Sequence, residues 1–581
     1  MRMLPMGHDA VLVEVSDLAA AMALHARLTA APPPGVVDIV PAAATVLVRV
    51  DPAVLRPAAV RAWVSSAVTS AAPPASASAS VTLPIRYDGA DLADLAALLG
   101  SSTEALAARH AGTDWTVAFT GFAPGFGYLV GAGWDLDIPR RPSPRTRVAA
   151  GSVGLAGVFS GAYPRESPGG WQLIGTTDAP LFNADADRPA LLVPGTAVRF
   201  DPMRSRVASS DAAGSDAAQS DSPTPDAATR PTLDVVTRLF PAPAAPPAPA
   251  RPPATEPATE PANGPATATA PEPPGRTAPA APRGVRVIAP GLQSTFQDGG
   301  RPGRAADGIG AAGAADPAAW ALANRLLGNR EGAAAIEVAV GGLRAVAERD
   351  LTVVVTGAWA PVVIDGRVGD PFVVHRWPTG AELRLDGFLA GSRAYLAVRG
   401  GWDVAPVAGS RSTDTLAGLG PAPLREGDVV PVGDDVAGPV PVLPLHPWGP
   451  PPAGTDAVPL DIPVMPGPRS DWLTSESRRR LAGETWIVSA AADRVGIRLE
   501  GPRLDRRRDD ELPSEGMVPG AIQVPPAGHP VVFGVDAPVT GGYPVVGVVT
   551  PAGLARLAQA RPGDRVRLRP TMRGEGPADD R

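Results

Sequence analysis

The sequence contains no cysteine and no lysine, and these two absences exclude several classes of function. Without cysteine there are no disulfides, no Cys-ligated zinc or iron–sulfur centres and no thiol nucleophile. All 52 basic residues are arginine, so the chain has no Schiff-base lysine, no P-loop lysine and no lysine that could carry biotin. Any fixed cation in a site must therefore be an arginine.

Basic blocks, long apolar runs and histidine clusters are also missing. The formal net charge is -7, and no basic block could track a phosphate backbone, so we expect no nucleic-acid partner. The longest uncharged apolar run, residues 351–364, is too short to span a bilayer. His8, Asp9 and Glu14 interrupt the start of the chain where a signal peptide needs an apolar core. The six histidines show no metal-ligand spacing. We expect a soluble, cytoplasmic protein with no membrane segment and no bound metal.

Composition divides the first half of the chain into two folded segments and a linker. Residues 1–78 have the strand and helix patterning of a small α+β module, with helices expected at 17–30 and 52–68. Residues 79–205 begin with a strand and two helices and continue with Gly- and Pro-punctuated strands, which favours a β-barrel. Residues 206–283 are rich in Ala, Pro, Ser and Thr and predict a disordered linker; within it, residues 232–240 have helical spacing and either dock or remain coil.

The second half is β-rich and divides near residue 445. Residues 284–445 contain one clear helix, in which Asp316 is the predicted N-cap, and residues 446–573 end with a short helix. The two halves end on similar segments, LLVPGTAVRF and RPGDRVRL. Either two related barrels or a common Pro-Gly turn before a strand explains this likeness. The predicted fold class is mainly β with α+β.

Five segments combine Gly, Pro and Tyr more densely than ordinary core strands do. Glycine permits close backbone approach, and clusters of backbone N–H groups can bind an anion or an oxyanion. Tight barrel turns would explain any single segment equally well, but three of the five tyrosines lie inside the set. The segments are residues 119–131, 151–177, 291–303, 514–530 and 535–544.

The first half resembles the B-type subunit of the bacterial 5-oxoprolinase, also described as allophanate hydrolase subunit 1. The resemblance runs through FAPGFGYL, PRRPSPRTRVAAGSVGLAG and YPRESPGGWQLIGTT. The second half resembles the C-type subunit through PGLQSTFQDGGRPG, GAADPAAWALANRLLGN, AAIEVAVGG, DRVGIRLEGP, SEGMVPGAIQVPPAGHPVVFGVDAPVTGGYP and RPGDRVRL. The resemblance covers essentially all of each folded half and implies cyclophilin-like β-barrels, one in the first half and two in the second.

The resemblance also implies a function, with two alternatives. It implies the fused B–C component of an ATP-dependent 5-oxoprolinase, which opens 5-oxo-L-proline to L-glutamate with a separate A-type (LamB/YcsF-type) subunit, using ATP and Mg²⁺. Related domains form the carboxyltransferase part of a biotin-dependent urea carboxylase, which would need carboxybiotin from another chain here. A stand-alone B-type protein inhibits a kinase, a role that needs only the first half. Fold alone does not choose among these functions.

A lactam-opening site needs an anion clamp and donors for the developing charge. The planar fork of arginine suits both carboxylate and phosphate, so we expect Arg147 and Arg301 to grip one anionic substrate in a pocket between the halves. Asp536 is the preferred acid/base candidate, and Asp298 either binds Mg²⁺ or holds its own turn. Ser152 and Glu515 are further catalytic candidates. The remaining candidates for substrate binding are Gly125, Tyr128, Tyr163, Gly169, Gly170, Gln297, Thr540, Gly541, Gly542 and Tyr543.

Overall fold

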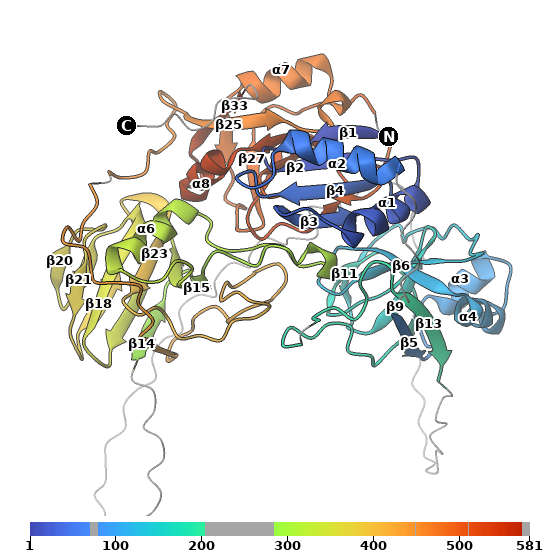
Figure 1. Ribbon diagram of the computed structural model, residues 1–581, viewed down its shortest axis with the longest axis horizontal. Helices are drawn as coiled ribbons and strands as arrows, with labels where there is room; N and C mark the ends of the chain where they lie inside the picture. Colours follow the sequence, from blue (N-terminus) through green and yellow to red (C-terminus); the bar gives the residue numbers. More distant parts are fainter. Residues whose placement is uncertain (70–78, 187, 204–283, 448, 509, 572–581) are drawn as a thin grey trace, which may run out of the picture.

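The computed structural model has three lobes around a central junction (Figure 1). It describes residues 1–69, 79–186, 188–203, 284–447, 449–508 and 510–571, so the predicted linker with its 232–240 segment lies outside the described residues. In Figure 1 the blue N-terminal module and the red-orange C-terminal barrel form the upper lobe, and the other two lobes lie below on either side. Among the described residues, no helix is both long enough and apolar enough to cross a membrane.

The N-terminal module is a four-stranded sheet that is buried on both faces. Helices α1 and α2 cover one face, where Val13 and Val48 lie in a core with Leu24. The other face packs on the C-terminal barrel through Leu12 and Leu47. Because both faces are buried, the central strands are apolar at almost every position. In the order β1-β2-β4-β3, the elements are β1 (Arg2–Pro5), β2 (Ala10–Glu14), β4 (Thr45–Val50) and β3 (Val36–Pro41), with α1 (Leu18–Ala30) and α2 (Pro57–Thr69).

The second unit is a seven-stranded, nearly closed barrel, as predicted for the first half. Its last strand pairs parallel with its first, and a bridge between Arg86 and Thr176 brings the two edges of the sheet together. Trp115 and Phe200 are buried in its core. In the order β12-β9-β10-β7-β6-β13-β5, the strands are Gln172–Thr176, Ser152–Ala156, Phe159–Ala162, Gly127–Gly131, Trp115–Thr120, Ala197–Pro202 and Ser80–Ile85. Helices α3 (Leu92–Leu98) and α4 (Thr103–Gly112) and the separate pair β8 (Arg145–Val148) and β11 (Ser167–Gly169) complete the unit.

The third unit consists of two sheets around one core, a more open arrangement than the closed barrel expected here. Phe296 and Trp377 lie in the shared core, and Asp316 caps α6 as predicted by accepting a hydrogen bond from the Ala319 amide. One sheet is β20-β19-β22-β17-β14-β24, with strands Arg367–Gly369, Val362–Ile364, Glu382–Leu385, Leu343–Ala347, Gly284–Pro290 and Val429–Pro431. The other is β15-β16-β23-β18-β21, with Gln293–Gln297, Ala335–Ala339, Ala390–Val398, Leu351–Trp359 and His375–Trp377, and is covered by α6 (Pro317–Leu327).

The fourth unit is a closed barrel whose last strand again pairs parallel with its first. The similar endings of the two halves thus form β13 and β33, strands with the same place in two related barrels. Sequence reasoning missed helix α7 (Ser475–Gly483), whose apolar content is low. The barrel order is β25 (Leu460–Pro466), β32 (Val545–Val549), β29 (Ala521–Gln523), β30 (Val531–Phe533), β27 (Gly496–Glu500), β26 (Trp486–Val488) and β33 (Arg565–Pro570). Helix α8 (Pro551–Gln559) and the pair β28 (Glu515–Gly516) and β31 (Thr540–Gly541) lie beside it.

Candidate functional site

Loops from all three lobes meet at the central junction. The Gly125 amide donates a hydrogen bond to the Asp307 carbonyl at 3.1 Å, which joins the loop before β7 to the segment before α6. Gly121 lies against Thr540 of β31 so closely that a Cβ atom at Gly121 would be 2.0 Å from the Thr540 hydroxyl oxygen. Two of the five glycine-rich segments, one from each half of the chain, therefore touch at this point.

A cleft of about 390 Å³ opens at this junction, in the region where the sequence led us to expect a site. We call it the junction cleft. The first half contributes the loop before β7 and the segment that leads into β11, and the second half contributes three separate segments. Its lining residues are Phe122, Ala123, Arg165, Glu166, Ser167, Pro168, Gln293, Thr415, Leu416, Asp493, Arg494 and Val495.

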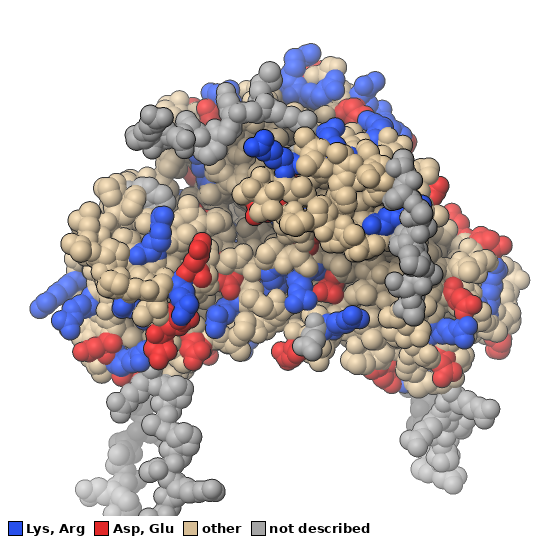
Figure 2. All heavy atoms as spheres, in the orientation of Figure 1, with Lys and Arg blue, Asp and Glu red and all other residues tan. Residues whose placement is uncertain are grey.

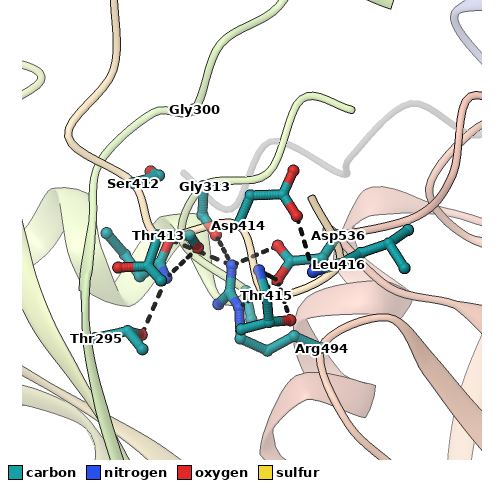
Figure 3. Close-up of polar contacts among 12 residues, drawn as sticks. Thr295, Gly300, Gly313, Ser412, Thr413, Asp414, Thr415, Leu416, Arg494 and Asp536 are labelled. Atoms are coloured by element: carbon teal, nitrogen blue, oxygen red, sulfur yellow. Dashed lines mark hydrogen bonds and ion pairs between the residues drawn. The ribbon is translucent and has the colours of Figure 1, made fainter. Parts of the chain in front are cut away.

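Arg494 is the buried anchor of the junction cleft (Figure 3). Its Nε and Nη2 donate to the two carboxylate oxygens of Asp536 at 3.0 and 2.8 Å, and its Nη1 donates to Glu337 at 2.7 Å. Nη2 also donates to the carbonyl of Gly313 and, at 3.2 Å, to Gln297. Burial alone would lower the pKa of Arg494, but the two carboxylates raise it. Its charge is thus neutralised within the protein, and we interpret Arg494 as a positioning residue.

Asp414 is a carboxyl group of the junction that sequence reasoning missed. One of its oxygens accepts hydrogen bonds from the amides of Leu416 and Ala417 at 3.0 and 2.8 Å. Burial raises the pKa of Asp414 to about 6, and the charge of Asp536 acts in the same direction. Figure 3 shows Asp414 beside Arg494 and the bonds of Thr415 to Asp536. A carboxyl with a pKa near 6 can take up and release a proton near neutral pH.

Arg165 is the cation of the first half that reaches the junction cleft. Its Nη2 donates to the carbonyl of Leu416 across the interface between the halves. Its Nε is buried and has no hydrogen-bond partner among the described residues. Burial lowers the pKa of this guanidinium, which Asp414 partly opposes. Because Arg165 lines the junction cleft, its charge favours an anionic ligand there.

A second cavity, of about 220 Å³, adjoins the junction cleft and shares Phe122 and Pro168 with it. We call it the aromatic cavity. It brings together four of the predicted substrate-binding residues: Tyr128 of β7, Tyr163 directly after β10, Gly169 at the end of β11 and Gly170 directly after it. Its lining residues are Phe122, Phe126, Tyr128, Arg140, Arg141, Pro142, Pro144, Arg145, Thr146, Tyr163, Pro168, Gly169, Gly170 and Trp171.

The structure does not bring the predicted arginine clamp together on one cavity. Arg147 is 77 % exposed and pairs with Glu166 at 2.8 Å. Arg301 is buried and donates to the carbonyls of Val407 and Ser412. Arg165 lies in the same matched segment as Tyr163, but its approach to Leu416 across the interface could not be deduced from spacing.

Three of the predicted catalytic residues are engaged in structural contacts or lie away from the cavities. Asp298 accepts hydrogen bonds from the amides of Gly300 and Arg411 and from the hydroxyls of Ser410 and Ser412, so it holds its own turn. Glu515 is buried and pairs with Arg469 beneath the N-terminal module. Ser152 is buried in β9 and is not among the lining residues of either cavity.

Asp536, the preferred acid/base candidate, is close to the junction cleft but fully engaged. Besides Arg494, its Oδ2 accepts from the amide and hydroxyl of Thr415 at 2.9 and 2.7 Å. With both oxygens occupied, it positions other groups.

The remaining predicted residues line neither the junction cleft nor the aromatic cavity. Gln297 accepts from Arg494 and donates to the Thr413 carbonyl at 3.0 Å. Thr540 and Gly541 form β31, and Gln523 donates to the carbonyl of Tyr543 at 2.9 Å. Gly542 follows β31 directly, and Gly125 lies in the loop before β7. The described residues contain no group of three or more His, Asp or Glu side chains able to hold a metal ion.

Comparison with known families divides the chain as the two halves do. The model described as "Carboxyltransferase domain, subdomain C and D" matches residues 1–192, and "Carboxyltransferase domain, subdomain A and B" matches residues 307–570. One solved structure, the protein designated TTHA0988, is 32% identical to this chain and superposes with a TM-score of 0.74. The match covers 97% of this chain and 99% of TTHA0988. Both halves therefore occur with the same fold in another single chain.

Named relatives match each half separately. The chain is 36% identical over 288 residues to the C-type subunit of 5-oxoprolinase from Escherichia coli (strain K12), covering 47% of this chain and 87% of that protein. It is 45% identical over 130 residues to the B-type subunit of 5-oxoprolinase from Escherichia coli O157:H7, covering 22% of this chain and 60% of that protein. It is also 31% identical over 314 residues to urea amidolyase of Lachancea kluyveri, covering 50% of this chain but only 17% of that protein.

Proposed function

Because the chain belongs to the carboxyltransferase-domain family that includes the B-type and C-type subunits of 5-oxoprolinase, we propose that it is the fused B–C component of an ATP-dependent 5-oxoprolinase. It would open 5-oxo-L-proline to L-glutamate together with a separate A-type subunit of the LamB/YcsF kind. The observation that carries this proposal is the junction cleft, which takes its lining from both halves and is incomplete in either half alone.

The chemistry of the lactam defines what the cleft must supply. A lactam is a stabilised amide, and transfer of the γ-phosphoryl group of ATP to its oxygen activates the carbon for attack by water. The ring nitrogen then leaves, and a second water hydrolyses the resulting acyl phosphate to L-glutamate and phosphate. Arg165, which lines the cleft, would bind the carboxylate of the substrate through its guanidinium group. Asp414 would hold and move the proton that the ring nitrogen needs in order to leave.

Arg494 and Thr415 position these groups. The Thr415 bonds to Asp536 and the Arg494 bonds to Asp536 tie the loop that carries Asp414 to the C-terminal barrel. Asp298 does not fit as a ligand of a protein-bound Mg²⁺, since it already accepts four hydrogen bonds. No step of the proposal depends on such a site.

A carboxyltransferase is the second candidate function, favoured by the match of half the chain to urea amidolyase. Such an enzyme would receive carboxybiotin from another protein, because this chain has no lysine for biotin attachment.

One experiment separates the two candidates. The purified chain is assayed for ADP release with 5-oxo-L-proline, in the presence and absence of the A-type subunit, and L-proline serves as the control because it lacks the lactam carbonyl. We expect ADP release only with 5-oxo-L-proline and most strongly when the A-type subunit is present. Decarboxylation of carboxybiotin without any 5-oxo-L-proline-dependent ADP release would instead establish the carboxyltransferase.

A further inference from the structure

The aromatic cavity has a composition that the junction cleft lacks. Four aromatic rings meet at its wall: Phe126 lies 5.3 Å from Phe122, 5.2 Å from Tyr163 and 5.3 Å from Trp171, measured between ring centroids. The ring pairs are steeply inclined, which is the favourable edge-to-face arrangement. Such a wall offers π faces and ring edges to a planar ligand, whereas 5-oxo-L-proline has no aromatic ring.

Three arginines line the same cavity and carry more positive charge than their partners neutralise. Arg141 and Arg145 both bind the buried carboxylate of Asp91, at 2.6 Å and at 2.7 to 2.8 Å. Asp91 also accepts from the Leu173 amide, so both arginines are held in fixed positions. The third, Arg140, is 4.0 Å from the exposed Glu511 and half exposed itself. Even when Glu511 is counted, the three arginines exceed the two carboxylates by one charge.

We propose that the aromatic cavity binds the base of an adenine nucleotide, with the phosphates held by the arginines at its rim. The inference rests on the proposed function, since it places the ATP of that reaction. The aromatic side chains of the cavity suit the planar adenine ring, and the planar guanidinium groups of its arginines suit the phosphates. The volume of about 220 Å³ suits one ring system and leaves the phosphates outside.

The neighbouring cavities then have separate tasks. Phe122 and Pro168 line both of them, so the nucleotide and the small acid would lie on opposite sides of these two residues. Phe122 has a φ of 65°, a left-handed conformation that is rare for a bulky residue. Strained residues of this kind cluster at functional sites.

Gly170 allows a test by filling the cavity. A Cβ atom there would have Pro144 as its nearest neighbour at 3.7 Å, an ordinary contact, and the larger side chain of Gly170→Leu would take up volume at the cavity wall. Gly112→Leu is the matched control, because Gly112 is exposed at the end of α4 with open space around it. Binding of MgATP and ADP to the full chain is measured by calorimetry, with neither the A-type subunit nor 5-oxo-L-proline present. We expect Gly170→Leu to weaken binding at least about tenfold and Gly112→Leu to leave it unchanged, with melting temperatures like the parent.

The rim is tested separately with Arg140→Gln. Arg140 has no close partner whose loss would disturb folding, and Arg199→Gln on β13 of the same barrel is the control for an exposed arginine. We expect a three- to tenfold loss of ATP affinity for Arg140→Gln alone, with a weaker salt dependence of binding.

Binding measurements would overturn the nucleotide site if the parent did not bind ATP, if Gly170→Leu left ATP binding intact, or if the cavity bound biotin in place of ATP and Gly170→Leu blocked it. These outcomes differ from failure of the proposed function. A nucleotide site lost in Gly170→Leu without any 5-oxo-L-proline-dependent ADP release would keep the site and refute the reaction. If instead the Gly170→Leu variant released ADP with 5-oxo-L-proline at the same kcat and KM as the parent, the reaction would stand and the nucleotide site would be refuted.

Discussion

Two barrels of this chain have the same strand order and put it to different uses. The strand order is β12-β9-β10-β7-β6-β13-β5 in the barrel of the first half and β32-β29-β30-β27-β26-β33-β25 in the C-terminal barrel. Each strand of the first barrel thus has a counterpart in the second whose label is higher by twenty. In both, the last strand pairs parallel with the first, helices follow the first strand, and a separate two-stranded sheet lies beside the barrel. Differences between them therefore reflect side chains more than topology.

The separate two-stranded sheets show the difference most clearly. In the C-terminal barrel the N-terminal module covers this sheet, and Leu47 packs against Gly516 of β28. In the first barrel the corresponding pair, β8 and β11, borders the aromatic cavity with Arg145 and Gly169. The pair β28 and β31 therefore packs against another part of the chain, whereas the pair β8 and β11 borders a cavity that a ligand could occupy.

The loops between the second and third barrel strands show a second difference. Both reach the junction cleft, one with Phe122 and the other with Arg494. On the face drawn in Figure 2, acidic and basic side chains are interspersed, apart from a group of basic side chains at the top, where α7 lies.

Arg494→Gln should have the largest effect on stability, and it tests whether the loops that carry Phe122 and Arg494 differ in structural role. The substitution leaves Asp536 buried without its paired cation and Glu337 with Arg393 alone, a change that costs about 3–5 kcal/mol. Phe122→Leu, in the equivalent loop of the other barrel, retains apolar volume and should cost about 1 kcal/mol. Thermal melting of both variants checks the difference, with the exposed Arg503→Gln as control. Equal losses for Phe122→Leu and Arg494→Gln would show that the two loops are structurally interchangeable.

Asp414 belongs to neither of these two barrels but to the third unit, and its substitution tests whether that unit completes the junction. Its pKa is raised from 3.8 to about 6 by burial, so between these values the folded protein binds more protons than the unfolded chain. Stability then falls as pH rises through this range, and the ionised group costs up to about 3 kcal/mol above pH 6. Asp414→Asn should remove this loss, since its side-chain oxygen still accepts from the same amides.

The measurement is the difference in melting temperature between pH 5 and pH 8. Asp414→Asn should show a smaller drop than the parent, whereas Asp435→Asn, an exposed carboxyl paired with Arg330, should match the parent. An unchanged pH dependence in Asp414→Asn would mean that this carboxyl is ionised without cost.

Local patterns predicted much of the fold. The capped helices α1 and α6 and the alternating or apolar strands of the first 50 residues lie close to the predicted positions, because caps and periodicity are local signals. Local patterns could not predict that the N-terminal module packs on the C-terminal barrel, which is the barrel farthest from it in sequence. The apolar run of β2 indicates that both faces are buried, but it does not say what covers each face.

The sequence motifs of the candidate site were predictable, but the contacts between residues distant in sequence were not. The tyrosines and glycines of the aromatic cavity were identified from local density. Asp414 was missed because its raised pKa depends on burial by distant segments, although Ser, Thr and Asp between glycines in residues 409–420 were a usable signal. The exposure of Arg147 and the burial of Arg301 likewise depend on tertiary packing.

Gly516→Ala and Gly170→Ala sharpen the contrast between the two separate sheets. A Cβ atom at Gly516 would lie 2.5 Å from the Leu47 Cβ, so the N-terminal module must shift, at a cost of about 2 kcal/mol. Gly170→Ala makes only ordinary contacts and should stay within about 0.5 kcal/mol of the parent. Denaturation midpoints decide between these expectations, and a neutral Gly516→Ala would show that the covered sheet is loosely packed.

Two arginines of the first barrel provide the smallest and most specific test, because they lie near each other in sequence and differ in environment. Arg165 reaches the junction cleft with a buried, unpaired Nε, whereas Arg147 is exposed and paired with Glu166. In the reconstituted enzyme we expect Arg165→Gln to lower kcat/KM at least about tenfold, roughly 1.4 kcal/mol. Arg165→Lys should not restore it, because a point charge does not reproduce the planar fork.

Arg147→Gln should change kcat/KM by less than about twofold, since an exposed ion pair contributes little. Steady-state kinetics with varied 5-oxo-L-proline, accompanied by melting curves, measures both variants under the same conditions. A large loss for Arg147→Gln with a silent Arg165→Gln would reverse the assignment. The substrate would then be held at the exposed edge of β8, and the junction cleft would serve only to join the two halves.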